Sequence, residues 1–173
     1  MKLQYHPLQP PVLLTNRSDA DYRYREFEPG EPLRPYVACY WTVETRTSSP
    51  PGKHRVIPDG CVDIIIDLNA SSANAFAVGI MTGCETPSLA EDRSLLGIRF
   101  FAEGARRFIR CPVSELGGRH VPLEALWGSE AASFLDEARE PGATACMRVK
   151  AGCPSGSWRR SSATASATSE GSS

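Results

Sequence analysis

The chain has 173 residues, of which 41% are hydrophobic and 23% are charged, and its formal net charge is -1 at pH 7. This length suits one domain with a substantial core, and the balanced composition excludes a fibrous or wholly disordered protein. The near-neutral charge argues against extensive phosphate contacts, because nucleic-acid-binding domains usually carry a basic excess. No apolar run is long enough to span a membrane or to act as a secretion signal, so we expect a cytoplasmic protein without a membrane partner.

The first 21 residues are predicted to form a lead-in arm or an edge strand, because three prolines remove backbone donors there. From Tyr22 onward, short apolar segments alternate with turn residues, which is typical of an antiparallel β-domain. Four segments are predicted to be strands: 36–43, 61–68, 75–81 and 95–101.

Two of these strands show a two-residue period. In the segment 61–68, β-branched and apolar residues at even positions alternate with Cys61, Asp63, Ile65 and Asp67, so opposite faces should differ. In the segment 36–43, one face is expected to carry Val37, Cys39, Trp41 and Val43.

The later part of the chain has helical patterns. A short helix is predicted over 105–110 between Gly104 and Pro112, and another from Pro122 to a stop at Gly128. A third follows Ser129, with apolar positions at helical spacing: Ala131, Phe134, Leu135 and Ala138. This apolar face could pack against the β-domain or meet a second copy of the chain.

Beyond residue 140 the periodicity is lost, and residues 141–173 are predicted to be a disordered Ser- and Ala-rich tail. The expected fold is therefore mainly β with a helical C-terminal part (α+β). It would be an antiparallel β-barrel or sandwich over 22–140, ending in short helices.

The six cysteines show neither a C-x-x-C zinc motif nor a disulfide pattern: Cys39, Cys61, Cys84, Cys111, Cys146 and Cys153. The inner four are scattered among apolar neighbours, where a free thiol behaves as a small hydrophobic side chain. We expect them to be reduced and to belong to the core.

Four segments carry motifs in a distinctive order and spacing. The first, 33–41, reads Leu-Arg-Pro-Tyr-Val-Ala-Cys-Tyr-Trp, and the second is the turn Pro58-Asp59-Gly60 before an apolar strand. The third is Gly97-Ile98-Arg99-Phe100 followed by Gly104, and the fourth is the helical end over 112–128. Together they resemble the N-terminal, cupin-like sensor domain of AraC-type transcription regulators. The turn at 101–104 departs from the Pro-Gly pair common in that family.

The resemblance implies a non-enzymatic domain that senses a small-molecule effector. The helix predicted after Ser129 could in addition form a homodimer, or a heterodimer with intact relatives. Members of this family continue into paired helix-turn-helix units. The Ser-rich tail stands in that place here, so we expect a truncated regulator without direct specific DNA binding. Two alternatives stay open: a small cupin-type enzyme of the isomerase kind, and a gene remnant without function.

The candidates for the effector pocket are Tyr36, Trp41, Asp59, Asp63 and Arg99. The Pro-Asp-Gly turn has a structural explanation, because proline presets the first turn position, aspartate bonds the local backbone and glycine tolerates positive φ. It also has a functional one, because Asp59 and Asp63 could orient an effector at the mouth of the barrel. Arg99 could pair with either carboxylate or contact the effector.

No catalytic, metal or cofactor site is expected. The three histidines, His6, His54 and His120, are far apart in the sequence, and the last two are expected in loops. The sequence contains neither a G-x-S-x-G nucleophile elbow nor a glycine-rich phosphate loop.

Overall fold

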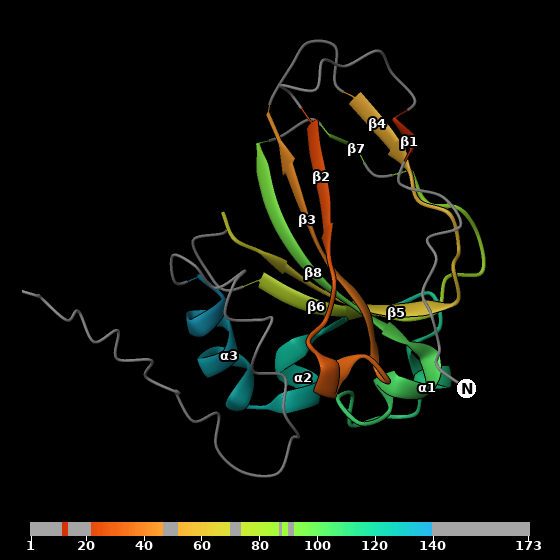
Figure 1. Cartoon of the computed structure of the whole chain (residues 1–173), viewed down its shortest axis with the longest axis vertical. Helices are drawn as coiled ribbons and strands as arrows, with labels where there is room; N and C mark the ends of the chain where they lie inside the picture. Colours follow the sequence, from red (N-terminus) through yellow and green to blue (C-terminus); the bar gives the residue numbers. More distant parts are fainter. Residues whose placement is uncertain are drawn as a thin grey trace, which may run out of the picture.

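The computed structural model describes residues 12–13, 22–46, 52–69, 74–86, 88–89 and 92–139. In these ranges two antiparallel sheets are followed by short helices, which lie together at one end of the molecule (Figure 1). The strands are β1 (Val12–Leu13), β2 (Tyr22–Phe27), β3 (Val37–Thr45), β4 (Gly52–Arg55), β5 (Cys61–Asp67), β6 (Asn74–Val78), β7 (Ser88–Leu89), β8 (Arg93–Phe101) and β9 (His120–Pro122). The helices are η1 (Glu31–Leu33), α1 (Ala102–Ala105), η2 (Val113–Leu116), α2 (Leu123–Trp127) and α3 (Glu130–Arg139).

The larger sheet has the strand order β2-β3-β8-β5-β6-β9, and the smaller sheet has the order β1-β4-β7. All the pairings are antiparallel. The predicted class, a mainly β antiparallel fold ending in short helices, is confirmed. The residues expected to form the N-terminal arm lie outside the described residues except Val12–Leu13, which form an edge strand; the predicted tail, 141–173, lies wholly outside them.

The two faces of the larger sheet differ in chemistry, as the alternation in β5 predicted. Val62, Ile64 and Ile66 are fully buried on the face that packs against the helices, which we call the helix face. The alternate positions, which include Asp63, point to the opposite side, which we call the charged face. Strand β8 follows the same rule, with Leu96, Ile98 and Phe100 in the core of the helix face.

Strand β3 departs from strict alternation at its start. The register shifts between Val37 and Cys39, so that Val37 pairs with Phe100 and packs in the core of the helix face. Cys39, by contrast, belongs to the hydrophobic cluster on the charged face. The prediction that Val37 shares a face with Cys39 was therefore wrong, because a β-bulge adds one residue to β3 at this point.

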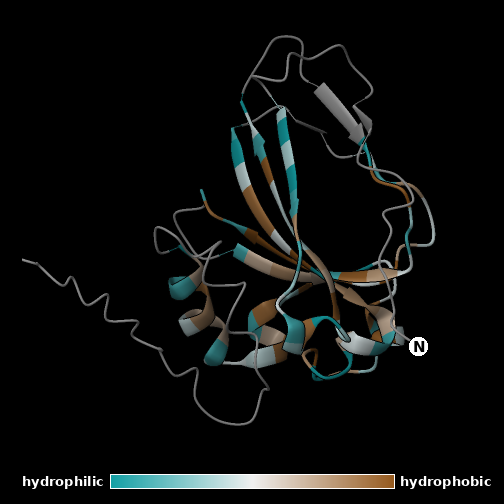
Figure 2. Cartoon of the chain, viewed as in Figure 1, coloured by the Kyte–Doolittle hydropathy of each residue, from teal (hydrophilic) through white to brown (hydrophobic). Residues whose placement is uncertain are grey.

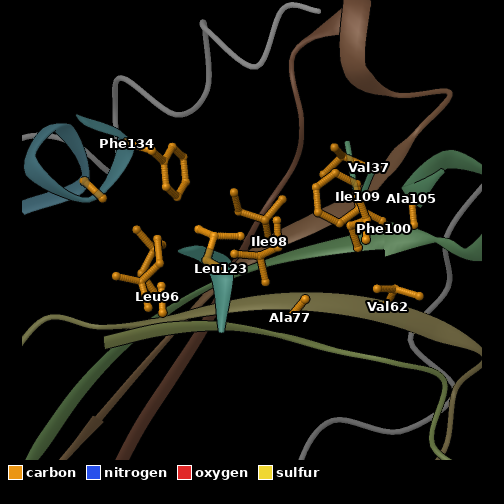
Figure 3. Close-up of a cluster of buried hydrophobic side chains, with 14 of the residues drawn as sticks. Val37, Val62, Ala77, Leu96, Ile98, Phe100, Ala105, Ile109, Leu123 and Phe134 are labelled. Carbon is orange, nitrogen blue, oxygen red and sulfur yellow. The ribbon is translucent and has the colours of Figure 1, made fainter. Parts of the chain in front are cut away.

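The core of the helix face continues into the C-terminal helices. Figure 3 shows the side chain of Phe134 on α3 pointing toward the side chains of the sheet. The four apolar residues of α3 are all buried in this core: Ala131, Phe134, Leu135 and Ala138. Of the two alternatives for this apolar face, packing against the β-domain or against a second copy, the structure shows packing within the chain. Figure 2 shows the complementary pattern, in which β3 and β8 become hydrophilic at the ends farthest from the helices.

The predicted helix over 105–110 was wrong, because α1 ends at Ala105, the first residue of that range. The amides of Arg107 and Phe108 donate to the carbonyls of Gly104 and Ala105, three residues earlier, so the regular four-residue pattern does not continue. Gly104 lies inside α1 rather than before a helix. A Cβ there would lie 2.5 Å from the carbonyl oxygen of Tyr36, so the glycine permits close backbone packing.

Several smaller expectations were also corrected. His54 lies in β4 and His120 in β9, where backbone pairing replaces the expected loops. Cys39 and Cys61 are buried as expected, but Cys84 is exposed and Cys111 is only partly buried. Cys84 follows the bend at Thr82 and Gly83 and directly precedes Glu85, which forms an isolated bridge with Val56. Within the described part of the chain, no helix is long and apolar enough to cross a membrane.

Replacing Phe134 tests the packing of α3. The ring is 5% exposed and lies edge-on to Trp127, with 5.1 Å between the ring centroids. We expect Phe134→Ala to lower the free energy of unfolding by about 3 to 5 kcal/mol, as for large cavities in protein cores. Urea unfolding followed by circular dichroism would measure this loss. Ser133→Ala, at an exposed position of the same helix, should change stability by less than about 0.5 kcal/mol, and equal effects would contradict the packing.

Candidate functional site

Arg99 lies on β8 in the middle of the larger sheet. Its backbone is paired with Cys39 of β3 on one side and with Asp63 of β5 on the other. Its side chain points to the charged face and is only 13% exposed. An arginine in such a place requires partners that compensate for the loss of water, and the neighbouring residues supply them.

The guanidinium of Arg99 bridges two carboxylates. Its Nε and Nη2 atoms lie 3.1 Å and 3.4 Å from Oδ1 and Oδ2 of Asp63, and Nη1 lies 3.2 Å from Oδ2 of Asp59. The planar fork of arginine suits this two-sided arrangement, which a lysine could not reproduce. Arg99 was expected to pair with one of the two aspartates, and in the structure it pairs with both.

Asp59 has a second role in the Pro-Asp-Gly turn. Its Oδ1 atom accepts a hydrogen bond of 3.0 Å from the backbone amide of Cys61, while Oδ2 contacts Arg99. Gly60 has a φ of 73°, which other residues rarely adopt. The structural explanation of the turn therefore holds, and the same aspartate also reaches the charged face.

Trp41 completes the cluster from β3. Its indole Nε1 donates a hydrogen bond of 2.9 Å to Oδ1 of Asp63, which lies two strands away. The indole must cross β8 to reach it, and it does so over Gly97, where any Cβ would overlap the ring. Gly97 therefore provides space for Trp41, and this explains why a glycine lies two residues before Arg99. We call Trp41, Asp59, Asp63 and Arg99 the Arg99 cluster.

Burial raises the pKa of the Asp63 carboxyl above its usual range, while Arg99 and the Trp41 indole act in the opposite direction. Burial and the nearby Asp59 likewise raise the pKa of the Cys61 thiol to about 12. The cluster thus holds its charges in poorly hydrated surroundings, where contacts between charged groups are strong.

The charged face extends beyond the predicted residues to Tyr24 and Glu26 on β2. The ring of Tyr24 stacks on Trp41 with 6.4 Å between the centroids and an interplanar angle of 30°, and its hydroxyl donates to Glu26. Neither residue was predicted. The alternation of Tyr22, Tyr24 and Glu26 with two arginines in the segment 22–27 is the signal that could have revealed them.

Tyr36, in contrast, is not part of this cluster. It precedes the bulge of β3 and packs at the core of the helix face, edge-on to Phe108 at 5.9 Å and beneath the guanidinium of Arg107. Its carbonyl accepts a hydrogen bond from the amide of Phe101, which ties the start of β3 to the end of β8. The sheet therefore separates Tyr36 from the other four pocket candidates.

Two other features of the molecule lie apart from the Arg99 cluster. In the described ranges, no three His, Cys, Asp or Glu side chains are grouped to hold a metal ion, and His120 stacks on Phe76 at 4.9 Å. A surface cavity of about 500 Å³ lies between η2, β9 and α2. It is lined by Cys111, Ser114, Glu115, Leu116, Gly117, Arg119, Val121 and Leu126, without any member of the Arg99 cluster.

Comparison with protein families gives one match. The model of a domain of unknown function, DUF6597, matches residues 25–122, which are more than half of the chain and include all of the Arg99 cluster. No curated protein matches the chain. No solved structure matches it.

The packing of Trp41 over Gly97 can be tested with one methyl group. We expect Gly97→Ala to displace the indole, shift its fluorescence and destabilise the fold by about 1 to 3 kcal/mol, the usual range for overpacking. Gly83→Ala is the matched control, because a Cβ at that exposed glycine meets nothing within 4 Å. Chemical unfolding followed by tryptophan fluorescence measures both effects, and a neutral Gly97→Ala would show that the ring does not need this space.

Thiol reactivity tests the burial beneath the cluster. Alkylation of the native chain with iodoacetamide at mildly alkaline pH should modify exposed Cys84 well before Cys39 and Cys61. Burial raises the pKa of both protected thiols, so they contain little of the reactive thiolate. Peptide mass mapping over time would give each rate, and in urea all the cysteines should react. Fast modification of Cys61 in the native chain would contradict this arrangement.

Proposed function

This chain belongs to the DUF6597 family, and we propose that it is the effector-sensing domain of an AraC-type transcription regulator. The proposal is supported by the resemblance over the ordered motifs from Leu33 to Gly128. It is also supported by an antiparallel β-fold that ends in short helices, which is the architecture the resemblance implies.

The observation that carries the proposal is the bridge from Arg99 to two carboxylates on a sheet face that is otherwise largely apolar. Tyr22, Cys39, Trp41 and Val43 form a buried hydrophobic cluster on this face. Buried ion pairs seldom stabilise a fold more than hydrophobic residues of similar size would, because the charges lose their hydration. A few oriented polar groups among apolar walls are, however, what a small-molecule site requires.

The same bridge suggests how binding could be transmitted. Asp59 lies in the turn between β4 of the smaller sheet and β5 of the larger one, and Arg99 holds this turn against β8. An effector that bound Asp59 or Asp63 in place of Arg99 would alter the contact that keeps this turn against β8. A ligand shifts such an equilibrium only by its difference in affinity for the two states, and competition with Arg99 for one of its carboxylates provides that difference.

A ligand screen tests the sensing role. In a thermal-shift screen of metabolites against the full chain, an effector at 100 times its Kd should stabilise the fold by about 2.7 kcal/mol. Arg99→Met should abolish the shift for that effector. Arg23→Met should retain it, because Arg23 is exposed and pairs with Glu44 on the other side of the sheet. If Arg99→Met fails to fold, Trp41→Phe removes the hydrogen bond to Asp63 and part of the ring over Gly97, and it should weaken binding.

The regulatory role needs a second measurement. The full chain, fused to a helix-turn-helix DNA-binding domain, should make a reporter gene respond to the effector found in the screen. The response should disappear with the same Arg99 variant and persist with the Arg23 variant. A reporter that ignores a bound effector would contradict the regulatory proposal, and a screen without any specific ligand would contradict the sensing proposal.

A further inference from the structure

The charged face combines an aromatic pair with an excess of carboxylates. Trp41 is held in place by Gly97 beneath its ring and by its hydrogen bond to Asp63. Tyr24 stacks on it from β2 and remains only half-buried, so that it lies at the accessible border of the face. The electron-rich faces of such rings attract cations, and a fixed indole is the strongest partner of this kind.

The charges around these rings are unbalanced in the described residues. Glu26, Asp59 and Asp63 supply three carboxylates near the rings, and Arg99 supplies one guanidinium. Farther along the same face, Arg93 on β8 and Asp67 on β5 add one charge of each sign. Glu26 and Arg99 both act electrostatically on Tyr24 and on Cys39, which places them in the same neighbourhood. The surplus of negative charge favours a positively charged guest. Asp59 and Asp63 are largely buried, where attraction is strong, and Glu26 is exposed at the border of the face.

The opposite class of ligand fits less well. A carboxylate ligand would have to be bound by Arg99, but Nε and both terminal nitrogens of Arg99 already lie at ion-pair distance from Asp59 or Asp63. An anion would therefore displace one carboxylate and meet the repulsion of the others. A neutral ligand could stack on the rings, but it would leave the surplus charge uncompensated.

Building on the proposed sensing function, we propose that the charged face binds a small organic cation, with an ammonium group against the half-buried ring of Tyr24, at the border of buried Trp41, and beside Glu26 and Asp63. Glu26 is the residue that gives the site its selectivity. Its carboxylate is one of two on this face, with Asp63, that accept hydrogen bonds from these rings, and it is not part of the bridge made by Arg99.

Matched probes test this charge selectivity. Isothermal titration calorimetry of the full chain should compare choline with 3,3-dimethylbutan-1-ol, which replaces its charged nitrogen by carbon. It should also compare butylammonium with butan-1-ol and with butyrate. We expect at least one cation to bind about tenfold more tightly than its neutral counterpart, with butyrate weaker still. The preference for the cation should decrease as the salt concentration rises.

Two single-charge variants locate the effect. Glu26→Gln keeps an acceptor for Tyr24 but removes the charge, and it should weaken cation binding about three- to tenfold. Glu44→Gln removes an equal charge on β3, where Glu44 faces away from the cluster and pairs with Arg23, and it should leave binding unchanged. Equal effects of the two variants would overturn the assignment to this face.

The other outcomes separate this inference from the function on which it rests. Saturable binding of butyrate or of the neutral alcohols without a preference for the cations would overturn the cation site while leaving a sensing role intact. Failure of both cations to bind would also overturn it. The metabolite screen decides the sensing role independently, since a neutral effector found there that depends on Arg99 would support sensing and contradict the cation site.

Discussion

Strand β8 imposes the constraint on which the rest of the structure depends. It is paired along both edges, with β3 and with β5, so each of its side chains must point to one of two faces. Leu96, Ile98 and Phe100 fill the core of the helix face, and each fully buried side chain of this kind contributes about 1.5 to 3 kcal/mol. A slip of one residue would lose this burial and place Arg99 in the core, so hydrophobic packing also fixes where the charges lie.

Much of this arrangement could be predicted because its cause is local. The alternation from Cys61 to Asp67 places Asp63 on the same face as Arg99 whenever the two strands pair in register. The apolar spacing in α3 predicts its buried side for the same reason. The Pro-Asp-Gly turn likewise follows from the backbone preferences of its residues. In each case a few neighbouring residues contain the whole physical explanation.

What could not be predicted depends on contacts between distant segments. The bulge at the start of β3 has no local signature, so Val37 was assigned to the wrong face. Gly104 resembles the start of a helix in the sequence, but its role is to let α1 approach the backbone of Tyr36. Gly97 is visible as part of a motif, but its purpose appears only when Trp41 crosses it from another strand.

The bulge divides β3 into two parts, and the alternation of side chains between the two faces starts anew after it. Before it, Val37 aligns with the helices, and after it the residues from Cys39 to Thr45 keep their register against β8. Losing or gaining one residue at Ala38 would rotate the chain on the η1 side while leaving Trp41 opposite Gly97. The bulge thus separates the conformation of the chain before Ala38 from the register of β3 after it.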